Sequence, residues 1–288
     1  MASSIPAPAS ARKPRRRPWL GPATAIAWLT IVILAALTAD LLPISEPDVD
    51  VGYGVQTPPF GVAAQVLGTD AQGRSILSRL IYGARVSLGA AATALVIAIV
   101  LGLIIGVTAG YVRGKLDTAI GLLVDVMLAF PALILLLALA AVLGSGISTI
   151  IIGLSIAAFP SFARLARSRT LQYAETEYVH AARGLGARRS TILLREVLPA
   201  VAPPVLAYAG VIAAVLVLAE AALSFLGLGV VTPTPSWGNM IADGRNYLQT
   251  RPHLVFIPAT VLFLTILSCN TLGEWLRERS DAQTTASP

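Results

Sequence analysis

The chain has 288 residues, of which 56% are hydrophobic and only 12% are charged, and its formal net charge is +6 at pH 7. With a mean hydropathy of +0.76, it is too apolar to enclose its hydrophobic residues in soluble domains that present a charged surface. The composition therefore predicts a membrane protein. A single cysteine, Cys269, excludes an internal disulfide and a metal cage built on cysteines.

The first 20 residues are rich in Pro, Ala and Arg and have no apolar period. They predict a disordered basic tail held near anionic lipid headgroups. A targeting signal is the alternative, since Arg15, Arg16 and Arg17 precede an apolar run. That run, within a first transmembrane helix at 21–42, is long for the apolar region of a signal, and cleavage would leave five spans.

The spans that follow from the pattern make this an all-α membrane protein with six transmembrane helices, because a span needs about 20 apolar residues. Retained positive charge marks cytoplasmic loops. With the N-terminus inside, all but five of the 21 basic residues fall on the inner side. Both termini and the 164–200 loop are therefore expected in the cytoplasm, and this topology explains the net charge without a nucleic-acid partner. The expected spans are about 24–42, 86–110, 119–143, 148–163, 204–228 and 254–272.

The first two spans are separated by an expected external loop at 43–85. Its first part is acidic, rich in Pro and Gly, and irregular. From residue 67 onward, apolar residues recur at helical spacing opposite Arg74 and Arg85, which predicts an amphipathic helix at the outer interface. Asp70 and Arg74 are expected to make a local contact at the start of this helix.

The transmembrane core is expected at 86–275, followed by a cytoplasmic tail at 276–288. Asp117 is placed to cap the third span. A charge within hydrocarbon is costly and usually faces the bundle interior or water. Glu220 is a candidate for the translocation path, and its alternative is a structural carboxylate that is hydrogen-bonded to a neighbour. Asp125 is a second candidate, with snorkelling or a helix-end bond as its alternative.

The cytoplasmic loop at 164–200 contains a polar, helix-forming segment from Glu177. Its apolar residues follow the i, i+3, i+4, i+7 spacing of one helix face, and Gly186 can adopt the positive φ that ends a helix. A second helix is expected to start at Ser190 or Thr191 and to stop at Pro199. This helix, turn and helix suits a soluble partner; a solvated surface helix is the alternative. The residues expected to dock are Glu177, Tyr178, His180, Ala181, Ala182, Arg183, Leu185 and Gly186.

Residues 180–199 resemble the EAA signature of the membrane subunits of ABC importers: two alanines, three residues, Gly, nine residues, then X-X-Leu-Pro. The chain departs from that signature at His180, which holds the glutamate position, and at Glu196, which holds a hydrophobic one. Further segments resemble the C-type permeases of dipeptide, oligopeptide and nickel importers, and the likeness runs from about 67 to 275. They are 67–85, Asp125 with Leu128-Ala129-Phe130-Pro131, and Glu220 to Gly227 with Pro235-Ser236-Trp237-Gly238.

This resemblance implies a type I ABC importer permease fold in a bacterial inner membrane, with Glu177–Leu185 as a coupling helix. The implied partners are a homologous second permease, two cytoplasmic ATPase subunits, an external substrate-binding protein or lipoprotein, and membrane lipid. The implied cargo is short peptides, with nickel complexes, haem or other small solutes as alternatives. External contact candidates are Asp70, Arg74 and Trp237.

Since the chain has no G-x-x-x-x-G-K-[ST] phosphate loop, ATP and Mg are expected only on the ATPase partners. The chain is thus expected to be a transporter subunit, without a cofactor or enzymatic activity of its own. An intramembrane enzyme would need a set such as H-E-x-x-H or G-x-S-x-G, which the sequence lacks. The main alternative is a self-contained, ion-coupled secondary transporter or channel. Against it stand the missing internal repeats and the form of the cytoplasmic loop.

Overall fold

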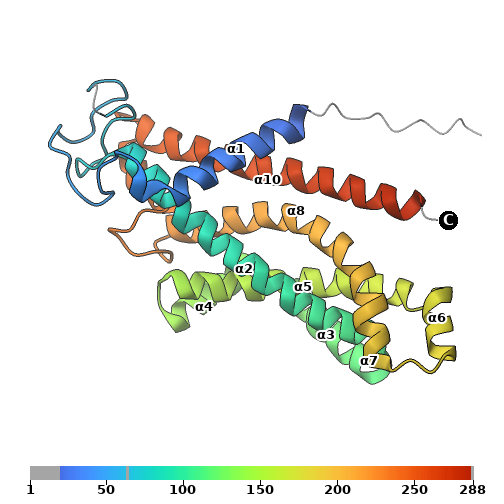
Figure 1. Ribbon diagram of the computed structural model, residues 1–288. Helices are drawn as coiled ribbons and strands as arrows, with labels where there is room; N and C mark the ends of the chain where they lie inside the picture. Colours follow the sequence, from blue (N-terminus) through green and yellow to red (C-terminus); the bar gives the residue numbers. More distant parts are fainter. Residues whose placement is uncertain (1–19, 63–64, 287–288) are drawn as a thin grey trace, which may run out of the picture.

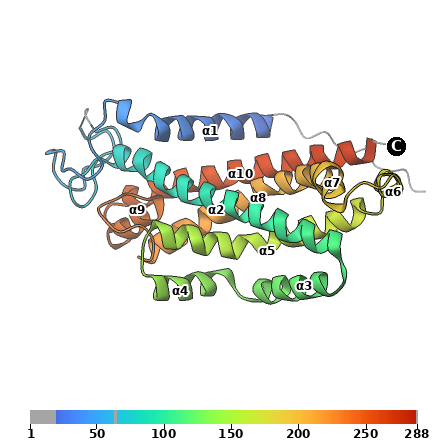
Figure 2. The same cartoon turned by 60° about the horizontal axis from the view of Figure 1, so that its bottom comes forward.

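The computed structural model describes residues 20–62 and 65–286, and almost all of the expected tail at 1–20 lies outside these ranges (Figure 1). The regular secondary structure of the described chain is helical, and only isolated β-bridges occur besides the helices. Its long helices are α1 (Leu20–Leu37), α2 (Ile76–Val112), α5 (Ile147–Tyr173), α8 (Leu198–Phe225) and α10 (His253–Ala286). All five run roughly along one bundle, with the 43–75 segment at one end and α6 (Glu177–Gly184) at the other (Figures 1 and 2).

Four helical stretches of the described chain are long and apolar enough to cross a membrane. A fifth span is added if the bent pair α3 (Gly114–Ala129) and α4 (Ala132–Leu143) counts as one. The first predicted span corresponds to the shorter apolar helix at Gly21–Leu37. The four stretches are Ile76–Val112, Ile147–Tyr173, Arg189–Phe225 and His253–Arg279.

The third predicted span, 119–143, is wrong as a single helix. Its two halves, α3 and α4, are bent by 89° where the chain passes through Phe130 and Pro131. Phe130 is extended, with φ −79° and ψ 131°, because a residue before proline is disfavoured in the helical region. Pro131 then precedes α4, where its missing N–H costs no helical hydrogen bond.

The expected interfacial helix at 67–85 is also wrong as a separate element. Residues 76–85 are the first turns of α2, which runs unbroken to Val112. Residues 67–75 form a loop closed by a bridge between Thr69 and Ser75, and the Ser75 hydroxyl accepts from the Ser78 N–H at the helix start. This part of α2 is held by the protein's own external segments: the Ser78 hydroxyl donates to the Ser45 carbonyl, and the Trp237 indole donates to the Leu80 carbonyl.

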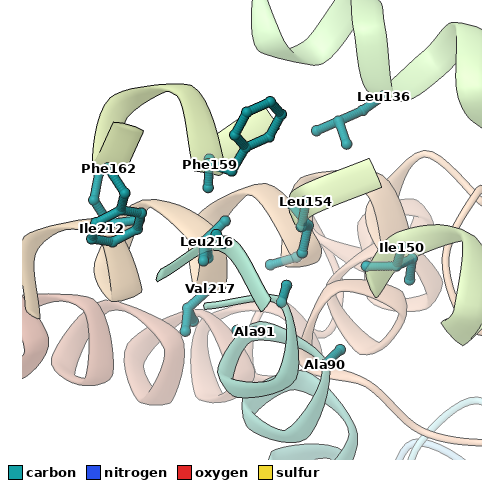
Figure 3. Packing of buried hydrophobic residues seen from close by; sticks show 14 of the residues in the cluster. Ala90, Ala91, Leu136, Ile150, Leu154, Phe159, Phe162, Ile212, Leu216 and Val217 are labelled. Atoms are coloured by element: carbon teal, nitrogen blue, oxygen red, sulfur yellow. The ribbon is translucent and has the colours of Figure 1, made fainter. Parts of the chain in front are cut away.

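The core lies where α2, α5 and α8 meet. Small residues let the backbones of α2 and α5 approach closely, as in membrane helix pairs generally. A Cβ placed on Gly106 would lie only 2.3 Å from the Ala163 carbonyl oxygen. Above this seam, buried side chains from α2, α4, α5 and α8 interlock (Figure 3). They include Ala90, Ala91, Leu136, Ile150, Leu154, Phe159, Phe162, Ile212, Leu216 and Val217.

Candidate functional site

The helix that the sequence predicts from Glu177 is present as α6 and projects from one end of the bundle (Figure 1). It ends as expected, because Gly186 has a φ of +78°. Around this turn the Ala187 N–H donates to the Ala182 carbonyl and the Gly186 N–H to the Arg183 carbonyl. This pattern satisfies the last carbonyls of a helix and favours glycine at the left-handed position.

The side chains of α6 divide into one anchor and an exposed face. Val179 is fully buried and fixes the helix to the bundle. Tyr178 is 45% exposed and Leu185 is 88% exposed, and Ala181 lies in the open between them. Exposed apolar side chains that lie together mark an interaction surface. The anchor was missed because a single valine one residue away from the predicted apolar face carries no signal of its own.

His180, at the glutamate position of the importer signature, pairs with an acid outside the helix. Its Nε2 lies 3.3 Å from Oε2 of Glu175. The other oxygen of Glu175 lies 2.5 Å from Nη2 of Arg113, at the end of α2. Arg113, with a smaller contribution from His180, lowers the pKa of Glu175 below its ordinary value. The three residues tie the start of α6 to the end of α2.

The expected stop at Pro199 is wrong. The helix α7 begins at Arg189 and continues through a π-helical turn, Leu193–Val197, into α8. The Leu198 N–H donates to the Leu193 carbonyl, five residues back. The wider turn shifts the hydrogen-bond register beside Pro199, which lacks an N–H and would clash with the carbonyl four residues before it. The loop after Gly186 is therefore joined to α8 as one helical stretch.

The two intramembrane acids lie in different surroundings. Glu220 is fully buried, and its Oε1 accepts a hydrogen bond of 2.8 Å from Ser224. Its Oε2 has no hydrogen-bond partner among the residues that the structure describes. The side chain of Asp125 is 66% exposed and lies 2.5 Å from Nη2 of Arg164 on α5. Within this chain, the Glu220 carboxyl is enclosed while that of Asp125 faces outward.

The prediction that Asp117 caps α3 is wrong. Asp117 lies in the first turn, but the N-cap position is Arg113 and has no side-chain cap. Both carboxylate oxygens of Asp117 instead accept from Arg167 on α5, with 2.7 Å between Oδ2 and Nη2. Arg164 and Arg167, one turn apart, thus hold α3 against α5 through two ion pairs. Asp117 therefore pairs with an arginine of another helix instead of accepting hydrogen bonds from the N–H groups at the start of α3.

At the other end of the bundle, Asp70 and Arg74 make the expected local contact, although in the loop before α2 and not within a helix. The Nε of Arg74 lies 2.7 Å from Oδ2 of Asp70. The buried Arg79 joins them, with Nε 3.4 Å from Oδ2 of Asp70 and Nη2 3.8 Å from Oδ2 of Asp243. Burial raises the pKa of Asp243, and Arg79 and Arg74 oppose that effect.

Sequence reasoning missed Arg79 and Asp243 as members of this cluster. The available signal was the position of Arg79, which stands three residues after Ile76 and four before Gly83, all on one helix face. Both of those neighbours are buried, as is Arg79 itself. A cation within an apolar stripe predicts a buried acidic partner, because an unpaired buried charge is costly.

The prediction that Trp237 is an external contact is wrong, because its side chain is fully buried. Its indole Nε1 donates to the Leu80 carbonyl at 3.1 Å, and its backbone N–H donates to Ser87 at 3.2 Å. It begins α9 (Trp237–Gly244), whose N-terminus is capped by Ser236. Tryptophan here fastens α9 onto α2 and is unavailable to another protein.

A bundle of helices that are long and apolar enough to cross a membrane defines a multi-pass membrane protein. The chain belongs to the family of binding-protein-dependent transport system inner membrane components, whose model matches residues 98–285. It is thus the permease of a binding-protein-dependent ABC importer. This class assignment confirms the resemblance read from the motifs.

Curated relatives agree with this membership. The chain is 42% identical over 214 residues to the glutathione transport system permease protein GsiD of Escherichia coli O6:K15:H31 (strain 536 / UPEC), covering 74% of this chain and 71% of that protein. GsiD of Shigella boydii serotype 4 (strain Sb227) gives the same values. Among solved structures, a chain of the inward-facing MetNI methionine ABC transporter has a TM-score of 0.57 at 21% identity. That match covers 70% of this chain and 96% of the other and supports the fold alone.

Proposed function

We propose that the chain is one of two homologous permease subunits of an ATP-driven importer of short peptides, and that it forms half of the translocation path. The observation that carries the cargo class is the 42% identity to permeases of glutathione transport systems, since glutathione is itself a short peptide. The resemblance of the 67–85 and 220–238 segments to peptide-type permeases agrees with it.

The coupling surface in this proposal is the exposed face of α6 with the Gly186 turn. The importer has two cytoplasmic ATPase subunits, which carry the ATP and Mg. Tyr178, Ala181 and Leu185 bind in a groove of the ATPase. Because α7 and α8 form one helical stretch from Arg189 to Phe225, a displacement of the docked loop moves α8. The anchor at Val179 supports this role.

The topology in this proposal has six spans, counting α1 and the bent pair α3 and α4 as one span each, and both termini in the cytoplasm. The end of α10 lies at the same end of the bundle as α6, and the described beginning of α1 faces that end (Figures 1 and 2). This placement supports an inner side that holds the termini together with the coupling loop.

The external end meets the substrate-binding protein through the 43–75 segment and the loops around α9. Tyr53 and Phe60 are exposed there, and Asp70 and Arg74 order the loop behind them. For the translocation path, the outward-facing pair Asp125 and Arg164 is better suited than Glu220, which is enclosed and accepts a hydrogen bond from Ser224 within its own helix.

The test is uptake into proteoliposomes that contain this chain with its partner permease, ATPase subunits and binding protein. Labelled glutathione and dipeptides should enter only with ATP and the binding protein present. Uptake that survives removal of the ATPase subunits while a proton gradient persists would favour a secondary transporter. ATP-dependent uptake of nickel or haem without peptide uptake would keep the importer and reject the cargo.

A further inference from the structure

A cavity of about 360 Å³ opens between α5, α8 and α10. Its lining comes from the second half of α5, the first turns of α8 and the second half of α10, and these parts of the three helices lie toward α6 and α7 (Figure 1). Arg164, Arg169 and Arg277 line it, together with the hydroxyl-bearing Ser161, Ser168 and Tyr208. Its volume is within the range of small-ligand sites, roughly 300 to 1,000 Å³. Among the described residues that line it, none is acidic.

The side chains that line this cavity supply hydrogen-bond donors from three guanidinium groups and three hydroxyls. Arg164 donates through Nη2 to Asp125, which lies outside the lining. Guanidinium groups bind phosphate oxygens through paired hydrogen bonds, and hydroxyls can supply further donors. The lining therefore favours a compact anion with several oxygens.

The depth of the cavity matches the level of lipid headgroups. The apolar run of α5 ends near residue 163, that of α8 begins near 204, and that of α10 ends near 272. The lining residues lie at or just beyond these three points. Since such boundaries mark where hydrocarbon gives way to the headgroup region, the three arginines lie where phosphates of the inner leaflet are found.

An apolar surface continues from the cavity toward the membrane centre. On α8, Val215 and Leu218 stand seven and ten residues after Tyr208 on the same helix face, and both are more than half exposed. On α10, Leu267 stands ten residues before Arg277 and is 49% exposed. A ligand with an anionic head and apolar chains would therefore find both parts accommodated.

We propose that this cavity binds the phosphate of an anionic phospholipid in the inner leaflet. Basic recesses between transmembrane helices on the cytoplasmic side hold anionic headgroups through charge and hydrogen bonds. Because Tyr208 and Pro204 belong to α8, which is continuous with the coupling loop, a bound lipid braces the inner end of that helix. The site does not depend on which cargo is transported.

The test uses the whole transporter, purified with its partner subunits and stripped of lipid. Phosphatidylglycerol or phosphatidylcholine is added, and bound lipid is counted by native mass spectrometry. The wild type should retain phosphatidylglycerol in preference to phosphatidylcholine, and added salt should reduce that preference. In the variant Arg169→Gln with Arg277→Gln, phosphatidylglycerol binding should weaken roughly 20-fold. The matched control is Arg279→Gln, which removes a cation of α10 outside the lining and should change binding less than about twofold.

Three results would overturn the proposal. Equal retention of the two lipids by the wild type would show that no anionic headgroup is selected. Unchanged phosphatidylglycerol retention in the double variant would place the lipid elsewhere. Binding of inorganic phosphate that the double variant loses, without any lipid preference, would identify a site for free anions. If the double glutamine variant does not assemble, Arg169→Lys with Arg277→Lys keeps both charges and should keep the wild-type preference; its loss would likewise count against the site.

Discussion

His180 lies 3.3 Å from Glu175, measured between Nε2 and Oε2. The acid that the importer signature places within the helix is thus replaced by a base, which pairs with an acid five residues earlier. Glu175 in turn holds Arg113. The exchange keeps an ionic contact at the start of α6 while moving the carboxylate onto the chain that leads into it.

We expect Glu175→Gln to lower the ratio of uptake to ATP hydrolysis about two- to fivefold. The change removes both contacts of the carboxylate, and exposed ion pairs contribute only modestly because solvent screens them. Transport and ATPase activity measured in the same proteoliposomes give the ratio. The control is Glu196→Gln, an exposed acid of the same loop for which the described structure shows no ion pair. Equal behaviour of the two variants would deny Glu175 a role in positioning α6.

Gly186→Val should uncouple ATP hydrolysis from uptake while leaving membrane insertion intact. A Cβ at this position meets nothing within 4 Å, so the effect comes from the backbone, whose φ is +78°. An L-residue held there costs about 1 to 2 kcal/mol, and a β-branched residue tolerates it poorly. The turn should open and carry Leu185 away from its docking position.

The matched control for this turn is Gly184→Ala. Gly184 lies two residues earlier, has a helical φ and also faces open space. Alanine there should be neutral or slightly stabilising. Substrate-stimulated ATPase activity and uptake that stay at wild-type levels in Gly186→Val would count against the docking role of the turn.

Local chemistry made part of this architecture predictable. The α6 period and the Gly186 turn follow from residues within a few positions of one another, and both are present as expected. Trp237 shows the limit, because its burial depends on Leu80, 157 positions away. Two prolines show it again: Pro131 ends a helix, while a π-helical turn absorbs Pro199. A proline thus ends one helix and lies within another, and the packing against neighbouring helices decides between these two outcomes.

Gly106→Ala should destabilise the bundle by about 1 to 3 kcal/mol or more, because overpacking forces the α2 and α5 backbones apart. The added Cβ would lie 2.3 Å from the Ala163 carbonyl oxygen and 2.8 Å from the Ala166 Cβ. Gly89→Ala, on the same helix, meets nothing within 4 Å and should be neutral or stabilising. Thermal unfolding of the purified transporter in detergent compares the two. A similar midpoint for both variants would mean that the helix seam is not tightly packed.

Arg79→Gln should destabilise the external end by about 3 kcal/mol, since removing this buried cation leaves Asp70 and Asp243 with Arg74 as their shared partner. Arg79 is 1% exposed and faces both Asp70 and Asp243. The control, Arg85→Gln, removes an exposed partner of Asp40 and should destabilise the protein far less, because solvent screens an exposed pair. Limited proteolysis of the 43–75 segment reports the local opening. Equal protection of that segment in both variants would contradict a buried clamp.

The loss in Arg79→Gln should be larger at neutral pH than at acidic pH. Burial raises the pKa of Asp243, and the charge of Arg79 opposes this rise more strongly than any other group does. Without Arg79, the pKa of Asp243 in the folded state rises further above its ordinary value of 3.8. A folded state that binds protons more tightly than the unfolded state loses stability as pH increases through that interval. Proteolytic protection of the variant should therefore improve relative to the wild type as pH is lowered toward about 4. If the difference in proteolytic protection between variant and wild type stays constant with pH, the pKa of Asp243 does not depend on Arg79.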